Sequence, residues 1–203
     1  MGQPGNIELS ELITTRISHD LGGSIGAVSS ALELLADNDN VLDNETLELL
    51  QISSRTLKFR QEFFRIAFGM NTKTPDKDAI TALCRNYLST LGGHTSALHL
   101  TLKGVNSSLA KIICLCVMIM AELAIRGGDI IIAIDSKNIT LSINSDYKLS
   151  AGKIADYELI IAGQTPQGEP SQYAHLLYLC ELLGSGVNIV TSASETEFRM
   201  TIS

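Results

Sequence analysis

The sequence lacks tryptophan altogether, and only 5% of its 203 residues are aromatic. Aromatic rings are the surfaces on which single-stranded nucleic acids stack their bases, so a chain with few of them offers little to such a ligand. Positive charge is also scarce, because 15 Lys and Arg face 22 Asp and Glu and leave a formal charge of −7. A surface with this balance is not expected to attract nucleic acid or an anionic membrane.

Paired cysteines and zinc-binding motifs are missing as well. The four cysteines are Cys84, Cys114, Cys116 and Cys180, and no two of them form a CxxC motif. Cys114 and Cys116 lie in an apolar run, where a thiol packs as a small hydrophobic side chain. We therefore expect reduced thiols, no metal site and no disulfide framework, which indicates a cytoplasmic protein.

Neither a signal peptide nor a transmembrane helix is recognisable. Residues 1–12, MGQPGNIELSEL, contain no basic segment followed by an apolar one. The most apolar segment, Ile112–Ala121, is too short to span a bilayer, which takes about 20 residues. We expect it to form a buried helix of a soluble protein that has no membrane partner.

What the N-terminal part does contain is the pattern of two long helices. Apolar residues recur with helical spacing over residues 7–36, and again from Asn44, which can cap the second helix, to about Met70. Residues 37–44, DNDNVLDN, suit a turn between them. The pattern predicts an antiparallel helical hairpin, too long and thin to be a complete domain.

The second helix carries two apolar stripes, each with residues spaced alternately three and four apart. The first consists of Leu47, Leu50, Ser54, Leu57, Gln61, Phe64 and Phe68, and the second of Leu49, Ile52, Thr56, Phe59, Phe63, Ile66 and Met70. A helix with one packing partner needs only one stripe. We interpret the second stripe as the contact with another subunit, which gives a homodimer with a four-helix bundle. The alternative is that it packs on the C-terminal half of its own chain.

After residues 71–75, NTKTP, the composition changes from linker to alternating helices and strands. We predict helices over residues 76–91, 107–125 and 171–183, strands over 96–103, 129–135, 139–144, 187–191 and 197–202, and a helix, less clearly, over 153–162. This order predicts an α/β sandwich with helices over one face of a mixed sheet. The chain is thereby divided into a hairpin domain, 1–73, and a sandwich domain, 74–203.

A histidine lies among three glycines within the first helix, in the segment ISHDLGGSIGAVSS at residues 17–30. The apolar stripe of this helix centres on Ile17, Val28 and Leu35, with Ile13, Leu21, Ile25 and Leu32 beside it. His19 falls about 160° away, on the solvent side. The residues that share its face are Arg16, Gly22, Gly23, Gly26 and Ser30.

Packing of the apolar stripe gives no structural reason for these glycines, because they lie on the opposite side of the helix. Each costs roughly 1 kcal/mol relative to alanine in a helix interior. We interpret the face as a surface kept bare so that another macromolecule can approach the imidazole, and we predict that its five residues bind that partner. The alternative is an ordinary exposed histidine in a flexible helix.

Asp20 fits a chemical role for the histidine. A carboxylate one residue along can accept a hydrogen bond from Nδ1–H and leave Nε2 free as a nucleophile. Imidazole with its usual pKa of about 6.5 is mostly neutral near pH 7. We therefore predict His19 and Asp20 as the catalytic pair.

The segment ISHDLGGSIGAVSSALELL resembles the histidine box of two-component signalling proteins, in which a phosphorylatable histidine precedes an acidic residue and a leucine. LKFRQEFFRIAFGM resembles ChpT-type histidine phosphotransferases, and AHLLYLCELLGSGVNIVTSASETEFRMTI is similar to a histidine-kinase C-terminus. The resemblance implies an α+β fold with a dimeric four-helix bundle followed by a degenerate kinase-ATPase-like α/β sandwich. It also implies that His19 accepts a phosphoryl group and that Asp20 supports it.

The motifs that an ATP-dependent kinase would need are not in the sequence. The helix after Asn106 contains no Asn, no DxGxG occurs, and only AGQTPQGEP is found where a phosphate lid would lie. We therefore expect no cofactor on this chain, with Mg²⁺ on the partner receiver domain. Relatives often carry a hydroxyl or amide and then a proline where Gly23 and Ser24 are found here, which argues against phosphatase activity and predicts a straighter helix.

The resemblance thus predicts a phosphorelay protein whose partners are receiver domains of response regulators and of a hybrid histidine kinase. The first alternative is a pseudokinase-like adaptor that binds such partners without accepting phosphate, and the second is a true kinase. The remaining histidines, His94, His99 and His175, are expected to be exposed or satisfied rather than metal ligands. Glu122 and Arg126, four apart on one helix, are expected to pair.

Overall fold

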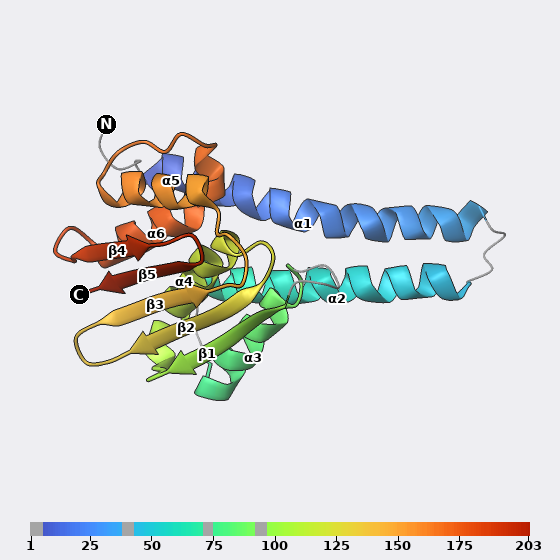
Figure 1. Cartoon of the computed structure of the whole chain (residues 1–203). Coiled ribbons are helices and arrows are strands. Elements are labelled where there is room, and N and C mark those ends of the chain that lie inside the picture. The colour runs from blue at the N-terminus through green and yellow to red at the C-terminus, as the bar shows by residue number, and fades with distance from the viewer. Residues whose placement is uncertain (1–5, 38–42, 71–74, 92–96) are drawn as a thin grey trace.

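The computed structural model describes residues 6–37, 43–70, 75–91 and 97–203 (Figure 1). Its α-helices are α1 Asn6–Asp37, α2 Asn44–Ala67, α3 Lys77–Leu88, α4 Ala110–Leu123, α5 Ala151–Ile161 and α6 Ala174–Leu183, and two 3₁₀ turns are η1 Ser107–Leu109 and η2 Pro170–Tyr173. The strands are β1 Leu98–Lys103, β2 Gly128–Ile134, β3 Ile139–Asn144, β4 Ile189–Ala193 and β5 Glu197–Ile202. The predicted helices and strands are all present, including the less certain helix after residue 153.

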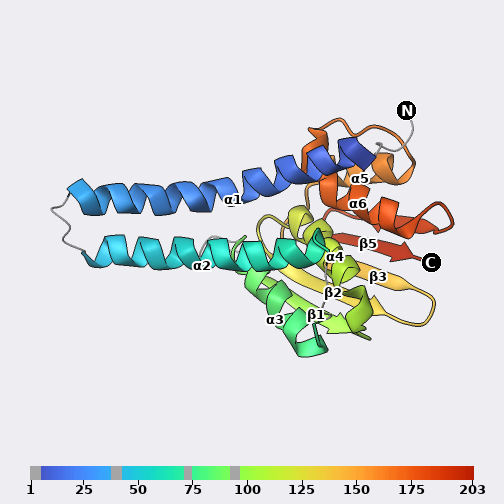
Figure 2. The same cartoon turned by 180° about the vertical axis from the view of Figure 1, so that it is seen from behind.

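Helices α1 and α2 form the predicted antiparallel hairpin, which projects from a compact body built by the rest of the chain (Figures 1 and 2). The N-cap of α2 is Asp43 and not the predicted Asn44. The Asp43 carboxylate accepts a hydrogen bond from the Thr46 N–H at 2.7 Å, while Asn44 already lies within the helix. Residues 38–42 of the predicted turn and the predicted domain boundary at 73/74 lie outside the described residues.

The body is a five-stranded sheet in the order β1-β2-β3-β5-β4. Strands β1 and β2 are parallel, with α4 in the connection between them, and the other neighbours are antiparallel. All helices of the body lie against one face of the sheet, and the other face is open (Figures 1 and 2). Side chains alternate accordingly, since Ile130 and Ile132 are buried under the helices while Asp129 and Ile131 face outward. The predicted α+β fold, a hairpin followed by a sandwich, is confirmed.

The core of the body is centred on α4, which is enclosed almost all round as its apolar run predicted. Every residue from Ile113 to Met120 is fully buried. Cys114 and Cys116 pack there as small apolar side chains, and the four cysteines are free thiols. No helix of the described part of the chain is long and apolar enough to cross a membrane.

The second apolar stripe of α2 meets two different environments. Near the body, Phe63 and Ile66 are buried in the core, which is the alternative that the sequence left open. Towards the tip, Leu49 and Ile52 remain exposed. The side chains that cover the stripe near the body therefore belong to the same chain, and the described residues do not cover it near the tip.

Helix α1 also differs from the prediction near the tip. The predicted apolar stripe included Ile25 and Leu32, yet both side chains are about half exposed. The residues buried at this level are small, Ser24 and Ala31. The single neighbouring helix, α2, covers only a narrow face of α1, so the larger side chains beside that face remain in solvent.

Candidate functional site

His19 lies on the exposed side of α1, close to where this helix leaves the body. Its side chain is 85% exposed. Around it the helix surface is bare, because a Cβ built on Gly22, Gly23 or Gly26 would have no described neighbouring atom within 4 Å. Ser30 is exposed as well. The structure thus places these predicted partner-binding residues on open surface beside the imidazole.

Arg16 does not lie on that open surface, which corrects the prediction. Its side chain is only 13% exposed because η2 and the end of α4 cover it. Its guanidinium donates hydrogen bonds through Nε to Asp20 Oδ2 at 2.6 Å, through Nη1 to the Gln172 carbonyl at 2.7 Å and through Nη2 to Glu122 Oε1 at 2.5 Å. The helical pattern showed the position of Arg16 on its own helix but not the distant segments that cover it.

Asp20 connects this buried arginine with the exposed histidine. Its carboxylate is 16% exposed, and Oδ1 lies 3.2 Å from His19 Nδ1, which is the contact expected from the sequence. Its backbone carbonyl accepts a hydrogen bond from Arg60 Nη1 of α2, whose guanidinium also bonds Thr90 after α3. The histidine–aspartate pair is therefore held on a segment of α1 that is tied to two other parts of the fold.

Glu122, at the end of α4, is the centre of a buried polar cluster. It accepts hydrogen bonds from Arg16, from Lys153 Nζ at 2.6 Å and from the Tyr157 hydroxyl at 3.4 Å. The predicted pair between Glu122 and Arg126 is not formed. Helix α4 ends at Leu123, and the Arg126 guanidinium lies over the Tyr147 ring, 4.1 Å from its centroid.

The surroundings of Glu122 favour the ionised form of its carboxyl group. Burial penalises the carboxylate, but the cations around it outweigh that penalty and lower its pKa to about 2. The largest of these attractions, from His175, requires a protonated ring, and burial lowers the pKa of His175 itself to about 4. Near neutral pH the carboxylate is therefore stabilised by Arg16 and Lys153. Arg16 remains charged because Glu122 and Asp20 raise its pKa in spite of burial.

Of the other histidines, His175 is fully buried at the base of α6. Its Nε2 lies 3.4 Å from the Tyr157 hydroxyl, while its Nδ1 has no hydrogen-bond partner within the described part of the chain. His99 is exposed on β1, and His94 lies outside the described residues. In the described ranges, no three His, Cys, Asp or Glu side chains are arranged to hold a metal ion.

A hollow of about 480 Å³ opens beside His19. Its lining comes from α1, the end of α4, α5 and η2: Thr15, Arg16, His19, Asp20, Glu122, Ile125, Lys153, Glu169, Ser171 and Gln172. His19 and Asp20 were predictable from the sequence, but the part that Glu122, Lys153 and Gln172 play was not. These residues are separated along the chain by elements of their own and form no local motif, so no signal in the sequence connects them.

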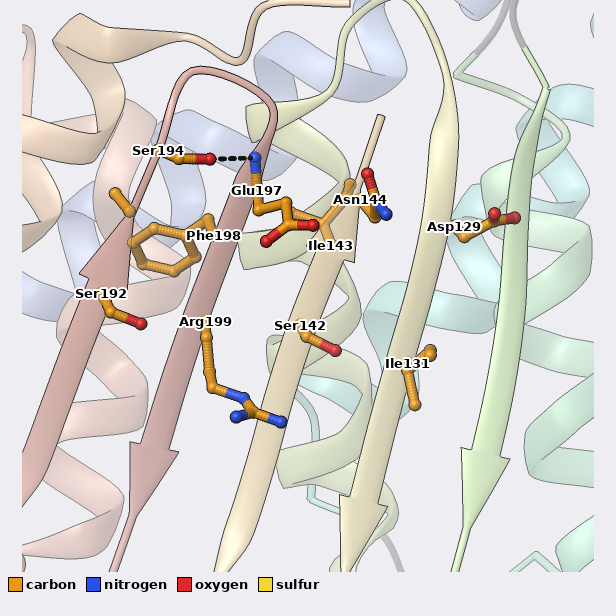
Figure 3. A pocket seen from close by; sticks show the side chains of 11 residues that line it. Asp129, Ile131, Ser142, Ile143, Asn144, Ser192, Ser194, Glu197, Phe198 and Arg199 are labelled. Atoms are coloured by element: carbon orange, nitrogen blue, oxygen red, sulfur yellow. Dashed lines mark hydrogen bonds between the residues drawn. The ribbon is translucent and has the colours of Figure 1, made fainter. Parts of the chain in front are cut away.

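A second hollow, of about 580 Å³, lies on the open face of the sheet (Figure 3). Polar residues and the apolar side chains of Ile131, Ile143 and Phe198 line it together, with Arg199, Asp129 and Glu197 as the charged groups. The Ser194 hydroxyl accepts a hydrogen bond from the Glu197 N–H at 3.1 Å. This hollow faces away from the helices and from α1. It contains no histidine or cysteine, so it offers no nucleophile comparable to His19.

The short segment between α5 and η2 is fastened to α5. The carboxylate of Asp156 accepts hydrogen bonds from the Gln167 N–H at 2.7 Å, the Gly168 N–H at 3.2 Å and the Tyr173 hydroxyl at 2.5 Å. The bond from Tyr173 is the main reason why the pKa of Asp156 is lowered. Three bonds to one carboxylate hold this segment in a fixed position.

Known proteins resemble the chain in sequence over one part and in fold over nearly all of it. No protein-family model matches. The protein phosphotransferase ChpT of Brucella abortus (strain 2308) is 36% identical over 63 residues, a stretch that spans 31% of this chain and 29% of that relative. The solved structure of a bacterial phosphotransferase, 19% identical, matches 98% of both chains with a TM-score of 0.78. The Acinetobacter baumannii histidine kinase AdeS, 14% identical, matches 91% of this chain and 95% of its own with a TM-score of 0.48.

The resemblance to ChpT-type phosphotransferases that the sequence predicted is thereby confirmed. The sequence match is to ChpT of Brucella abortus over one part of the chain, and the fold agrees with that of a solved bacterial phosphotransferase over nearly the whole chain. The dimer and the receiver partners remain predictions.

Proposed function

We propose that the protein is a histidine phosphotransferase of a two-component phosphorelay, in which His19 carries the phosphoryl group between the aspartates of two receiver domains. The observation that carries the proposal is the state of His19. Its ring is 85% exposed on a bare helix surface, while Nδ1 faces the Asp20 carboxylate and Nε2 is left for reaction. The likeness to ChpT supports the same function.

The chemistry requires only groups that this arrangement supplies. With the proton on Nδ1, the Nε2 lone pair attacks the phosphorus of an aspartyl phosphate on the donor receiver. The bond between phosphorus and the aspartate oxygen breaks, and its electron pair remains on the departing carboxylate. The phosphorylated ring keeps its Nδ1 proton and gains positive charge, which the Asp20 carboxylate stabilises. Transfer to a second receiver reverses these steps.

A receiver domain must approach closely, because reacting atoms have to come within roughly 3–3.5 Å. Gly22, Gly23, Gly26 and Ser30 form the docking surface in this proposal, and Arg16 is removed from it because it is buried. The donor would be the receiver of a hybrid histidine kinase and the acceptor that of a response regulator. Any Mg²⁺ would be bound by the receiver and would neutralise charge on the transferred phosphoryl oxygens.

We further propose that the transfer uses no ATP and that the protein is a homodimer. The Asp156 bonds that fix the segment before η2 support the first point, since a nucleotide lid has to open and close. The exposed side chains of Ile25, Leu32 and Ile52 support the second, because a second hairpin laid alongside would bury them in a four-helix bundle.

The test is to incubate the purified protein with a receiver domain that carries a ³²P-labelled aspartyl phosphate. We expect a label on this chain that is labile in acid and stable in base, and that is lost in the His19→Ala variant. His99→Ala is the matched control, because it removes another exposed histidine far from the bare surface and should keep the label. Binding of the receiver without labelling would favour an adaptor, and labelling by ATP alone would indicate a kinase.

A further inference from the structure

We propose that Glu122 of α4 is a positioning residue for His19, and that it acts through Arg16 and Asp20. The inference rests on the proposed phosphotransfer function, because it assigns a role in that reaction to a residue of the body. It also explains why a carboxylate is buried at the end of an otherwise apolar helix. A series of hydrogen bonds runs from the imidazole inward to the body.

The orientation of the His19 ring depends on a single contact. The side chain is 85% exposed, so packing does not hold it, and in the described part of the chain the Asp20 carboxylate is its hydrogen-bonding partner. This bond selects the tautomer with the proton on Nδ1. In the other tautomer the proton occupies Nε2 and removes the lone pair that attacks phosphorus. Fixing Asp20 therefore keeps the histidine reactive.

Asp20 is fixed by Arg16. One carboxylate oxygen, Oδ2, receives the Arg16 Nε–H at 2.6 Å, and the other is thereby turned towards His19 Nδ1. The guanidinium is rigid and planar, so the direction of Nε is set once both terminal nitrogens are bonded. These nitrogens bond the Gln172 carbonyl and the Glu122 carboxylate, which belong to the body.

Glu122 is itself held firmly. Its side chain is 12% exposed, and Lys153 and Tyr157 of α5 bond the oxygen that Arg16 does not use. The cations around it lower the pKa of its carboxyl in spite of burial, so the group is charged near neutral pH. Charge-assisted hydrogen bonds therefore run without interruption from the body to the imidazole.

A simpler role for the Glu122–Arg16 pair would be to fasten α1 to the body. The structure already provides another fastening at the same level, because Arg60 bonds the Asp20 carbonyl and both the side chain and the carbonyl of Thr90. Ile17 and Leu21 of α1 also pack against the hydrophobic core. Loss of Glu122 should therefore leave the helix backbone in place and release only the Asp20 side chain.

The test compares Glu122→Gln with the matched variant Glu195→Gln, in which a carboxylate is removed from the exposed pair with Lys148. The first readout is the ¹⁵N NMR spectrum of the His19 ring, which distinguishes its tautomers and needs no receiver. We expect protonated Nδ1 in the wild type and in Glu195→Gln, and a shift towards protonated Nε2 in Glu122→Gln. An unchanged tautomer in Glu122→Gln would overturn the proposal.

The second readout is single-turnover transfer from a phosphorylated receiver. In Glu122→Gln we expect the rate at saturating receiver to fall about tenfold, less than the hundredfold that a misplacement of about 1 Å can cause. The receiver concentration for half-maximal rate should not change, because the glycine surface is intact. A higher half-saturating concentration with an unchanged rate would make Glu122 a docking residue and would overturn the positioning role.

Glu122→Gln leaves Arg16 without one of its charged partners, so a denaturation curve must first show that the variant is folded. If it is not, Arg16→Lys provides the same comparison, because a compact ammonium group cannot bridge Asp20 and Glu122 as the guanidinium does. A folded Arg16→Lys protein with the wild-type tautomer would overturn the proposal. If the wild type takes no label while its tautomer still responds to Glu122→Gln, the proposed function fails and the orienting role remains.

Discussion

His175 is the residue whose burial has the clearest consequence for stability. Its ring is enclosed between α4, α5 and α6, and burial lowers its pKa from 6.5 to about 4. The charged or titratable groups around it are Glu122 of α4, Tyr157 and Lys153 of α5, and Arg16 and Asp20 of α1. The folded protein therefore keeps this ring neutral at pH values where an unfolded chain protonates it.

We predict that the free energy of unfolding falls as the pH is lowered from about 6.5 to about 4, by up to about 3 kcal/mol. In this window the unfolded chain binds a proton at His175 and the folded chain does not, so acidification favours unfolding. Glu122 contributes at lower pH, because its pKa falls from 4.5 to about 2 and the stability it provides is lost only below about 4.5. Urea denaturation at pH 7 and pH 5 measures the effect.

The variant for this prediction is His175→Leu, which removes the titrating ring and fills much of its space. Its stability should depend much less on pH between 6.5 and 4. The Tyr157 hydroxyl keeps the Ile119 carbonyl, at 3.3 Å, as a partner. If the variant lost stability as steeply as the wild type does, another group would be responsible for the effect.

Single residues also show how far the sequence could lead. His19, Asp20 and the glycines were predictable because a helix places them on one face by its own geometry. Arg16 belongs to the same face, yet the body covers it. The sequence around Glu122 does not indicate that this side chain contacts α1. Helical periodicity states where a side chain lies around its own axis, but it carries no information about a distant segment that comes to cover it.

The element that stands out is α1, a helix of 32 residues with three glycines in its middle. Added methyl groups would meet open space at Gly22, Gly23 and Gly26. The packing of the described residues thus gives no reason for glycine there, and the helix is weaker for it. The function proposed above supplies a reason, because a receiver has to come close to His19.

We predict that Gly22→Ala, Gly23→Ala and Gly26→Ala each raise the free energy of unfolding by about 0.5–1 kcal/mol. The same variants should raise the receiver concentration needed for half-maximal transfer, because the added methyl groups occupy the docking surface. Denaturation curves and transfer kinetics measure the two effects separately.

Gly152→Ala is the control for these variants. Gly152 lies in α5, and a methyl group there would also meet open space. The substitution should stabilise the protein without a change in transfer. Unchanged transfer in all three α1 variants would mean that the bare surface is not where a receiver docks.

At the same scale, element boundaries and partners were harder to predict than the elements themselves. The buried α4 and the five strands followed from apolar runs and alternation. The second stripe of α2 is a packing face near the body, where Phe63 lies in the core, whereas Ile52 near the tip lies in solvent and its contact with another subunit stays a prediction. An apolar stripe in the sequence shows that one face of a helix is apolar, but it does not show which residues cover that face.

On the scale of the whole molecule, a group of exposed apolar side chains lies on the half of the hairpin that extends beyond the body. Ile25, Leu32, Leu34, Leu49 and Ile52 are all exposed there. We predict that the wild-type protein has twice the mass of one chain in light scattering, and that Leu32→Glu combined with Ile52→Glu converts it to a monomer. Charges introduced on this face would have to be buried without partners in a bundle.

Leu182→Glu is the matched control, because Leu182 is a similarly exposed leucine on α6 of the body. It should leave the dimer intact. A monomeric wild-type protein would contradict the prediction and would leave the tip of the hairpin to another partner.

The hydrogen bonds that connect Glu122 to the part of α1 that contains His19 have a consequence for gene recombination and for protein engineering. In the proposed reaction the nucleophile lies on α1, while Glu122, which would aim it through Arg16 and Asp20, lies 106 residues after Arg16 in the sequence. A chimera that joined this hairpin to the body of a distant homologue would present the same imidazole on the same bare helix, yet leave it free to turn. Recombination between such genes should therefore succeed only where both parts are exchanged together.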